Sequence, residues 1–248
     1  MSRSVSVVVS SFVALAVALV TAPAFAQDPP APPPAEPAAT PPPVAQQTAA
    51  ATGSVFEQPG FDFGVRLGYA LPMGNTSGSE KLSDGVSGAI PVVLEAGYRL
   101  TPNFTIGALF QYGLAQIKDG DTTGCGSGID CSGSVIRLGV EGIYNLNLGT
   151  ALTPWVGIGA GYEWFSITAS AGGQSASVSA KGFEFATLHA GGDVRVAPNF
   201  ALGPFLSFSL AQYASASLEG GGMSMSMDID QKSMHEWLQI GVRGRFGI

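Results

Sequence analysis

The sequence predicts an all-β fold: an eight-stranded antiparallel up-and-down transmembrane β-barrel with a polar, filled interior and an apolar, lipid-facing exterior. Three observations predict it. Apolar residues occupy every second position in eight segments, short and long connections alternate between these segments, and charged residues are only 12% of the 248 residues. An alternation of period two places one set of side chains on each face of a strand.

The composition also narrows the function classes. Charged residues make up about 25% of an average soluble domain, so this chain does not resemble an ordinary cytosolic enzyme. The formal net charge is −7 and the basic residues do not cluster, so no nucleic-acid partner is expected. Two cysteines are too few for a thiolate zinc site. We therefore expect no metal, no cofactor and no enzymatic activity.

Residues 1–26 predict a secretory signal peptide. An apolar stretch runs from Val5 to Val20, and Ala24-Phe25-Ala26 supplies the small residues of a cleavage site. The alternative is an uncleaved membrane anchor, but the stretch is short and no basic flank follows it.

Residues 27–56 predict a disordered periplasmic linker. Nine of the 17 prolines lie between Asp28 and Pro43. Because proline lacks an N–H group, this segment cannot form a helix or join a sheet, and an extended tether is expected. A spacer is the simpler interpretation, and a ligand for a periplasmic partner or the cell wall is the alternative. The barrel is expected over 57–248.

Eight segments carry the alternation: 61–71, 92–100, 104–114, 136–145, 156–164, 183–196, 200–210 and 238–246. A tilted strand needs about 9–11 residues to span a bilayer, and each segment is close to that length or longer. An even number of strands lets the sheet close with both chain ends on one side. The parity slips near Thr187–His189, which predicts a β-bulge.

The connections differ in length from one end of the barrel to the other. Short turns are expected at Thr101–Asn103, Leu148–Thr153 and Ala197–Asn199, and long loops at Pro72–Ser87, Lys118–Gly133, Ala169–Lys181 and Ala214–Ser233. Short turns on one side and long loops on the other are typical of the periplasmic and extracellular ends of an outer-membrane barrel.

Charged residues within the strands are expected inside the barrel, in pairs. Every arginine after residue 26 falls in a predicted strand, and a charge on the lipid face costs about 2–4 kcal/mol at the midplane. The predicted lumen network comprises Arg66, Glu95, Arg99, Arg137, Glu141, Glu163 and Arg243. It would form either a salt-bridged plug or the lining of a narrow polar path.

Periodicity does not decide which face lies outside, because a soluble lipocalin-like barrel would turn its apolar face inward. The export signal and the Gly-rich polar face favour lipid outside. So do aromatic residues near the strand ends, such as Tyr98 and Tyr144 at one end and Tyr112 and Trp164 at the other.

With these features, residues 61–248 resemble the small eight-stranded outer-membrane β-barrel family, the OmpA/OmpX/OmpW-like group of Gram-negative bacteria, without a peptidoglycan-binding domain. The resemblance implies a location in the bacterial outer membrane. It also implies contact with outer-membrane lipid and lipopolysaccharide, and assembly by periplasmic chaperones and the barrel-insertion machinery. The C-terminal insertion signal of such barrels is matched by Gln239, Gly241 and Phe246, whereas Gly244 departs from it. A monomer is favoured.

Three further groups of residues could have a structural or chemical role. Cys125 and Cys131 flank a Gly-rich stretch in a predicted surface loop, and an exported protein lives where disulfides persist, so we expect an intraloop disulfide. Ser233 and His235 share a face of the last strand and suggest either a lipid-modifying hydrolase or, more simply, a polar girdle histidine. The run Met223–Met227 alternates Met with Ser and predicts a strand continuing above the membrane, with soft-metal binding as the less favoured interpretation.

These expectations define three candidate functions. The first is a non-enzymatic barrel that displays surface loops, with a role in envelope structure or adhesion. The second is a narrow porin-like channel for ions or small solutes, and the third is a lipid-modifying hydrolase.

Overall fold

The computed structural model describes residues 55–120, 125–126, 128–146 and 152–248. The predicted signal peptide, the linker up to residue 54 and residues 148–151 of one predicted turn lie outside the described residues. The elements are η1 (Val55–Glu57), β1 (Gly60–Ser77), β2 (Glu80–Lys81), α1 (Leu82–Gly85), β3 (Val86–Arg99), β4 (Phe104–Ile117), β5 (Asp130–Asn145), β6 (Leu152–Ala171), β7 (Gln174–Ala197), β8 (Phe200–Gly220), β9 (Met223–Asp228) and β10 (Met234–Gly247).

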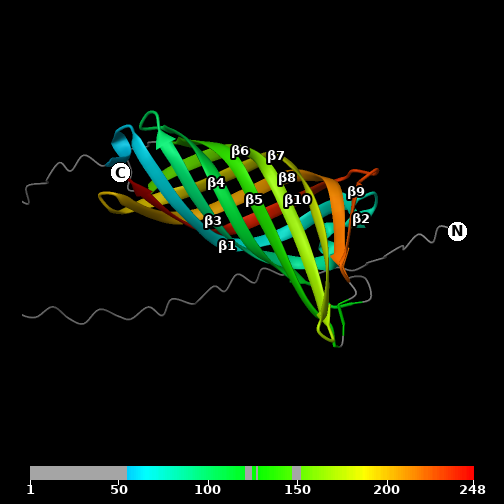
Figure 1. Cartoon of the computed structure of the whole chain (residues 1–248). Helices are drawn as coiled ribbons and strands as arrows, with labels where there is room; N and C mark the ends of the chain where they lie inside the picture. Colours follow the sequence, from blue (N-terminus) through cyan, green and yellow to red (C-terminus); the bar gives the residue numbers. More distant parts are fainter. Residues whose placement is uncertain (1–54, 121–124, 127, 147–151) are drawn as a thin grey trace, which may run out of the picture. The chain divides into compact units, whose positions relative to one another are not determined.

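Eight antiparallel strands form a closed hydrogen-bonded ring (Figure 1), which confirms the predicted fold class. Consecutive long strands pair with each other, and β10 closes the ring by pairing with both β8 and β1. The closing pair runs without a register shift from Asp62 opposite Gly247 to Gly74 opposite His235. Closure leaves the ring without an unpaired edge, which is the condition for strands to cross a bilayer.

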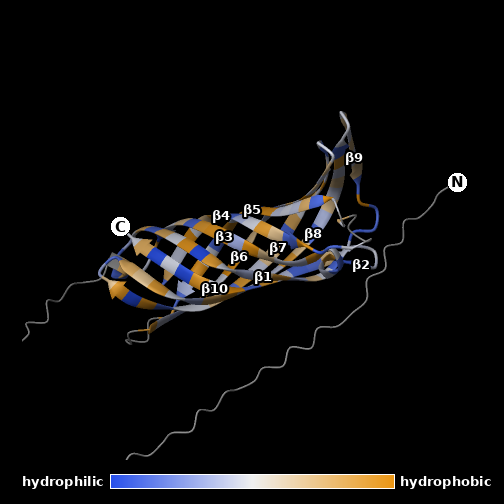
Figure 2. Ribbon diagram, turned by 90° about the horizontal axis from the view of Figure 1, so that it is seen from below, coloured by the Kyte–Doolittle hydropathy of each residue, from blue (hydrophilic) through white to orange (hydrophobic). Residues whose placement is uncertain are grey.

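The outer wall is apolar and the interior is polar. Side chains such as Leu67, Val140 and Ile240 are exposed on the outside, whereas Arg66, Glu141 and Arg243 are buried inside. In Figure 2 hydrophobic and hydrophilic residues alternate along each strand of the barrel wall. An outer wall of this kind matches lipid and not water. Among the described residues, no helix is long and apolar enough to cross a membrane.

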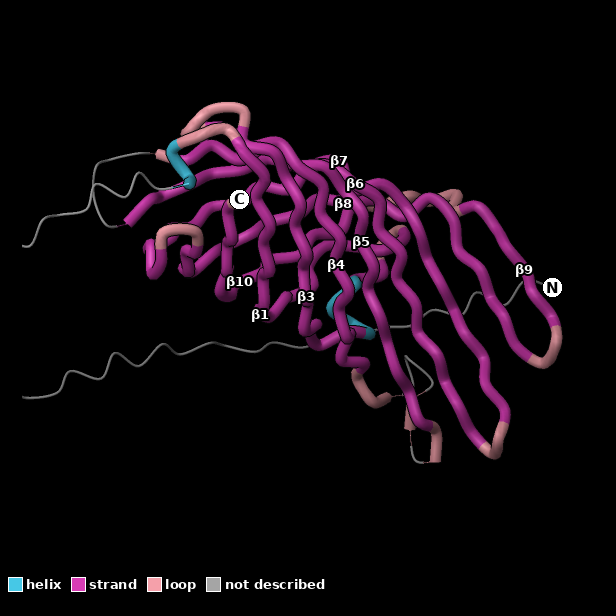
Figure 3. The backbone as a smooth tube through the Cα atoms, turned by 60° about the vertical axis from the view of Figure 1, so that its left-hand side comes forward, coloured by secondary structure: helices cyan, strands magenta, loops and turns pink. Residues whose placement is uncertain are grey.

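The strands are longer than a bilayer requires, and this corrects the predicted loops. β6, β7 and β8 have 20, 24 and 21 residues and continue past the barrel as hairpins, visible in Figure 3 as long paired tubes. The prediction of a loop over Ala169–Lys181 is wrong, because only Gly172 and Gly173 separate β6 from β7. Both adopt positive φ, which a tight hairpin turn requires and glycine permits.

The opposite end has the short turns. β3 and β4 are joined by residues 100–103, and β7 and β8 by Pro198 and Asn199, as predicted. The register between β7 and β8 shifts between Glu184 and Ala186, so the predicted bulge lies just before Thr187. This extra residue restores Thr187 and His189 to the interior, where both are buried.

Candidate functional site

Three layers of charged and polar side chains lie in the lumen, and we define each by its residues. The central layer comprises Arg66, Glu95, Glu141, His189, Asp193 and Arg243. The loop-end layer comprises Arg137, Glu163, Glu184, Tyr213 and His235. The turn-end layer comprises Asp62, Arg99, Thr105, Asn145 and Arg245. All of these side chains are buried.

The central layer crosses the lumen. Arg66 on β1 forms an ion pair with Glu95 and donates from Nη2 to Glu141 Oε2 on β5 at 3.0 Å. Arg243 donates from Nε to Glu95 Oε2 at 2.9 Å, and its Nη1 lies 3.4 Å from Asp193 Oδ2. The Arg243 guanidinium also lies 4.4 Å from the ring centroid of Trp155. Arginine suits this role because its planar fork serves several carboxylates at once.

The loop-end layer is organised around Glu163. Arg137 donates from Nε to Glu163 Oε2 at 2.8 Å, Tyr213 donates its hydroxyl to Oε1 at 2.5 Å, and His235 Nε2 lies 3.1 Å from the same Oε1. His235 also stacks on Tyr213, with ring centroids 4.0 Å apart. A carboxylate with this many donors has little capacity left for a ligand.

The turn-end layer is closed by the segment that precedes β1. Asp62 pairs with both Arg99 and Arg245. The ring of Phe56 lies 4.9 Å from the Arg245 guanidinium carbon and 5.5 Å from that of Arg99, and Arg99 donates to the Gln58 carbonyl. Phe56, the last residue of the predicted linker, therefore packs against arginines at the barrel mouth.

An apolar cluster closes the loop end. Its buried members are Ala70, Leu82, Val86, Ala89, Val135, Phe165, Tyr213 and Trp237. Leu82 is supplied by the short helix α1, so the connection between β1 and β3 folds into the mouth. The apolar side chains cover the loop-end layer from outside.

Two of the cavities among the described lumen residues are small, with volumes of about 10 Å³ each. One is lined by Asp62, Glu95 and Arg245 among others, and the other by Arg66, Gln111 and Thr187 among others. A space of this size holds about one water molecule. The two cavities share no lining residue. Between the central and loop-end layers, Gln239 donates to Gln111 across the lumen at 3.0 Å.

A Ser–His–Glu arrangement lies in the central layer. His189 Nδ1 is 3.1 Å from Ser207 Oγ, and His189 Nε2 is 3.4 Å from Glu141 Oε2. Arg66 Nη1 also lies 3.1 Å from His189 Nδ1. Because arginine only donates hydrogen bonds, it occupies the lone pair that a general base would need. All these side chains are buried, so this arrangement is structural.

The structure corrects the interpretation of His235. The side chain has 0% exposure and points into the lumen, so it is neither a girdle histidine nor a partner for lipid hydrolysis on the outer face. Ser233 precedes β10 and donates to the Gly78 carbonyl at 3.1 Å. The reason is parity: His235 has the same parity as Gln239 and Arg243, which are buried inside. Within the described ranges, no group of three or more His, Cys, Asp or Glu side chains is placed to hold a metal ion.

Arg195 departs from the expectation that every strand charge is inside. Its side chain is 44% exposed and lies 3.6 Å from Glu57. It belongs to the last three residues of β7, next to the turn at Pro198. At a strand end a guanidinium can reach water and headgroups, so no interior partner is required.

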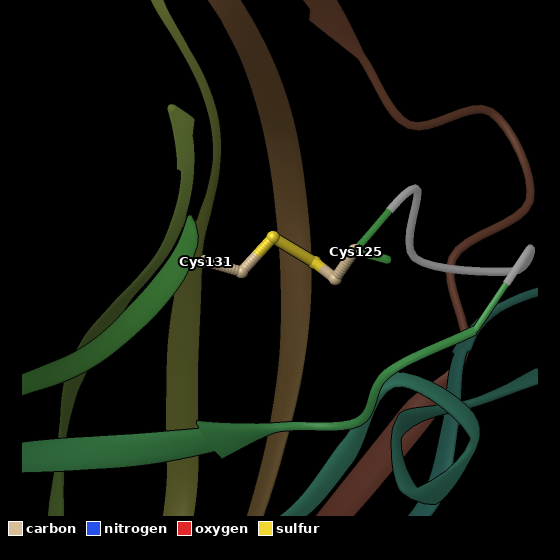
Figure 4. Close-up of a disulfide and its surroundings, with 2 residues drawn as sticks. All are labelled: Cys125 and Cys131. Atoms are coloured by element: carbon tan, nitrogen blue, oxygen red, sulfur yellow. A yellow bond between two sulfur atoms is a disulfide. The ribbon is translucent and has the colours of Figure 1, made fainter. Parts of the chain in front are cut away.

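The predicted disulfide is present. Cys125 and Cys131 are joined with a Cα–Cα distance of 5.9 Å, and Figure 4 shows the bond linking the loop to the start of β5. The disulfide restrains the connection between β4 and β5 at the loop end of the barrel.

The residues of the predicted insertion signal lie in three environments. Gln239 is buried inside, Phe246 is exposed on the outer wall, and Gly241 lies at the closing pair of strands. A Cβ on Gly241 would lie 2.0 Å from the Leu67 carbonyl oxygen, so this glycine has a packing role at the closure. Its role in recognition by the insertion machinery remains a prediction.

Above the barrel, β6 to β9 form a sheet that we call the surface sheet: 165–171, 174–181, 215–220 and 223–228. One face carries small and apolar residues, with Ile167, Val178, Leu218 and Met225 in register across four strands. The other face carries hydroxyls, with Ser166, Ser179, Ser217 and Ser226 in register. Ser166 and Ser179 are hydrogen-bonded at 2.9 Å.

Comparisons with known proteins identify solved structures of similar fold. No protein family model matches the chain, and no curated protein matches it. A major outer membrane protein from Thermus thermophilus is 15% identical over 76% of this chain and 99% of that chain, with a TM-score of 0.50. Neisserial surface protein A is 14% identical over 75% and 98%, with a TM-score of 0.47. The outer membrane protease OmpT from Escherichia coli is 9% identical over 76% and 97%, with a TM-score of 0.40. At 15% identity, the Thermus thermophilus structure shows a shared barrel fold and nothing about activity.

Proposed function

We propose that this outer-membrane β-barrel is a closed, non-enzymatic membrane anchor whose working part is the surface sheet, with a role in envelope structure or adhesion. The observation that supports the proposal is the set of buried, paired charges along the lumen. Phe56 and the Gln58 carbonyl contact arginines at one mouth, and the apolar cluster around Trp237 lies toward the other.

The arrangement of the charges supports a plug over a polar path. An ion path needs groups that bind weakly enough to release their ligand. Here the arginines Arg66, Arg137 and Arg243 are each engaged by two carboxylates. Separating these pairs would leave buried charges unpaired, at a cost of about 3–5 kcal/mol each.

The surface sheet supports the display role. It carries the long hairpins away from the barrel, and the disulfide between Cys125 and Cys131 restrains a neighbouring loop. We include in the proposal export by residues 1–26, a periplasmic linker over 27–56, insertion through the signal around Phe246, and contact with outer-membrane lipid and lipopolysaccharide.

Single-channel recording of the refolded chain in a planar bilayer tests the proposal. We expect no discrete conductance steps from protein whose insertion is verified by protease protection of the barrel, while a general porin in the same bilayer conducts. Reproducible steps that change in the variant Glu141→Gln would contradict the closed lumen and establish the channel alternative.

A further inference from the structure

The strand β9 carries three of the six methionines of the chain, all on one face. Met223, Met225 and Met227 are 78%, 61% and 52% exposed. Methionine in a protein core fills irregular gaps with its flexible side chain, but side chains this exposed fill none. Packing therefore does not explain why methionine occupies these three positions.

Strand propensity does not explain the three methionines either. The residues enriched in strands are β-branched and aromatic, and Val178, which lies in the same row as Met225 and Leu218, is one of them. What distinguishes methionine from such residues is its thioether sulfur, which is polarizable and can be oxidised. The composition of β9 therefore indicates a role for the sulfur atoms.

The geometry of β9 favours a reaction at each sulfur over one metal ion shared by all three. Alternate residues on one face of a strand are about 6.4–6.8 Å apart, so the three side chains form a row along the strand. A soft metal ion would need its thioether ligands around a single point. Oxygen transfer needs only that each sulfur is reached from water.

We propose that Met223, Met225 and Met227 form an oxidation site, at which two-electron oxidants such as hydrogen peroxide or hypochlorous acid convert methionine to methionine sulfoxide. With hydrogen peroxide, a sulfur lone pair attacks one oxygen, so that an S–O bond forms and the O–O bond breaks. The sulfur is oxidised by two electrons and the peroxide is reduced. The departing hydroxide takes the proton from the transferred oxygen and leaves as water.

The other methionines after the signal peptide are less accessible and serve as references within the same chain. Met73 lies on the lipid-facing wall of β1 and is 36% exposed. Met234 is half-buried at the start of β10, and its sulfur accepts a hydrogen bond from Gln212 Nε2 at 3.6 Å. Because the oxidant approaches from water, susceptibility follows exposure, and both should react more slowly than β9.

Oxidation changes the surface sheet and leaves the barrel unaffected. A sulfoxide is polar where the thioether is apolar. Met225 stands opposite Leu218 and Met227 opposite Ala216, so the reaction turns the edge of the apolar face polar. β9 pairs with residues 215–220 of β8, beyond the part of β8 that pairs with β10, so the ring of strands keeps its contacts.

Limited oxidation of the refolded chain in detergent micelles with hydrogen peroxide, followed by mass spectrometry, tests the proposal. Trypsin, added after the chain is unfolded, places all three β9 methionines in peptide 196–232, Met73 in 67–81 and Met234 in 233–243. We expect each methionine of 196–232 to be oxidised about tenfold faster than Met73 or Met234. In a chain unfolded in urea before oxidation, all five should react at similar rates.

Two conservative variants assign the oxidised positions. Met225→Leu keeps the side-chain volume, and peptide 196–232 should then take up two oxygen atoms in place of three. Met234→Leu is the matched control and should leave the uptake at three. Heat-modifiable migration on gels verifies that the barrel stays folded after oxidation. The proposal is overturned if peptide 196–232 reacts no faster than Met73 and Met234 in the folded chain.

Oxidation of intact Gram-negative cells relates the site to the surface sheet, and this step rests on the display role proposed above. A chloramine that does not cross membranes is expected to oxidise peptide 196–232 before the other two peptides. Oxidation of this peptide in micelles but not on cells would contradict the display role, while the site itself would stand. Equal rates of all three peptides in micelles would contradict the site, whatever the result on cells.

Discussion

Glu95 and Arg243 are hydrogen-bonded across the closure of the barrel, from the strands on either side of β1. Arg243 on β10 donates from Nε to Glu95 Oε2 on β3 at 2.9 Å, and β1 lies between these strands. Arg66 of β1 pairs with the same carboxylate. One buried carboxylate thus ties together the three strands at the place where the first and last strands meet.

Glu95→Gln is expected to destabilise the barrel strongly. The amide keeps the volume but removes the charge shared by Arg66 and Arg243, which leaves each guanidinium underpaired in a buried layer. Breaking a buried pair by removing one partner costs about 3–5 kcal/mol. Urea unfolding in lipid vesicles, followed by tryptophan fluorescence, measures the change. Glu219→Gln on the exposed face of β8 is the control and should change stability by less than about 0.5 kcal/mol. Equal effects of the two variants would contradict the shared-carboxylate account.

Gly203→Ala is expected to prevent close pairing of β7 and β8. A Cβ at this position would lie 1.7 Å from the Gly192 carbonyl oxygen, and a backbone atom cannot move aside without breaking the ladder. Overpacking costs about 1–3 kcal/mol or more, so the folded, heat-resistant band on gels should decrease sharply. Gly113→Ala is the matched control, because its Cβ would meet nothing closer than 3.6 Å. If both variants fold alike, the backbone approach at Gly203 is looser than the structure indicates.

The sequence was sufficient to predict the ring because lipid on one side and a polar lumen on the other impose strong alternation. Val65 and Leu67 alternate with Gly64 and Arg66 in a way that only a two-faced strand explains. Above the membrane this contrast weakens. Residues 175–180 still alternate serine with alanine or valine. Because these apolar side chains are small, the contrast between the two faces is weak and the sequence predicts a loop there.

The sequence predicts which residues of the candidate site face the lumen, but not which of them pair with each other. The alternation along each strand predicts that Glu141 and Arg243 face the lumen. The same alternation predicts this for Trp155, which lies on the same face of β6 as Glu163. Pairs such as Arg66 with Glu141 cross the lumen, and their distance depends on strand tilt and stagger, which periodicity does not report. Phe56 carried no signal, because it lies beyond the alternating segments.

His235→Ala is expected to weaken the barrel without affecting lipids. The substitution removes the stack on Tyr213 and the contact with Glu163 Oε1 at 3.1 Å, and leaves a buried carboxylate oxygen with one donor fewer, at a cost of about 1–3 kcal/mol. Unfolding experiments and mass spectrometry of the outer-membrane lipids provide the two measurements. Ser233→Ala, which removes one bond to a backbone carbonyl, should have the smaller effect on stability. Loss of lipid hydrolysis with unchanged stability would instead identify an enzyme.

Cys125→Ser is expected to loosen the loop while leaving the barrel intact. The disulfide closes a short segment, with a sequence separation of 6, and a ring of that size restrains the unfolded chain by about 2 kcal/mol on the chain-entropy model. The bond joins the loop to Cys131, the second residue of β5. Its main effect is therefore on local opening of the loop between β4 and β5 and not on the pairing of strands in the ring. Limited proteolysis of intact cells should cut the variant between β4 and β5 well before the wild type, and a reductant applied to the wild type should reproduce the effect. The free energy of urea unfolding of the barrel should fall by no more than about 2 kcal/mol in the same samples. A fall in barrel stability as large as that of Glu95→Gln would mean that the disulfide supports the strands themselves.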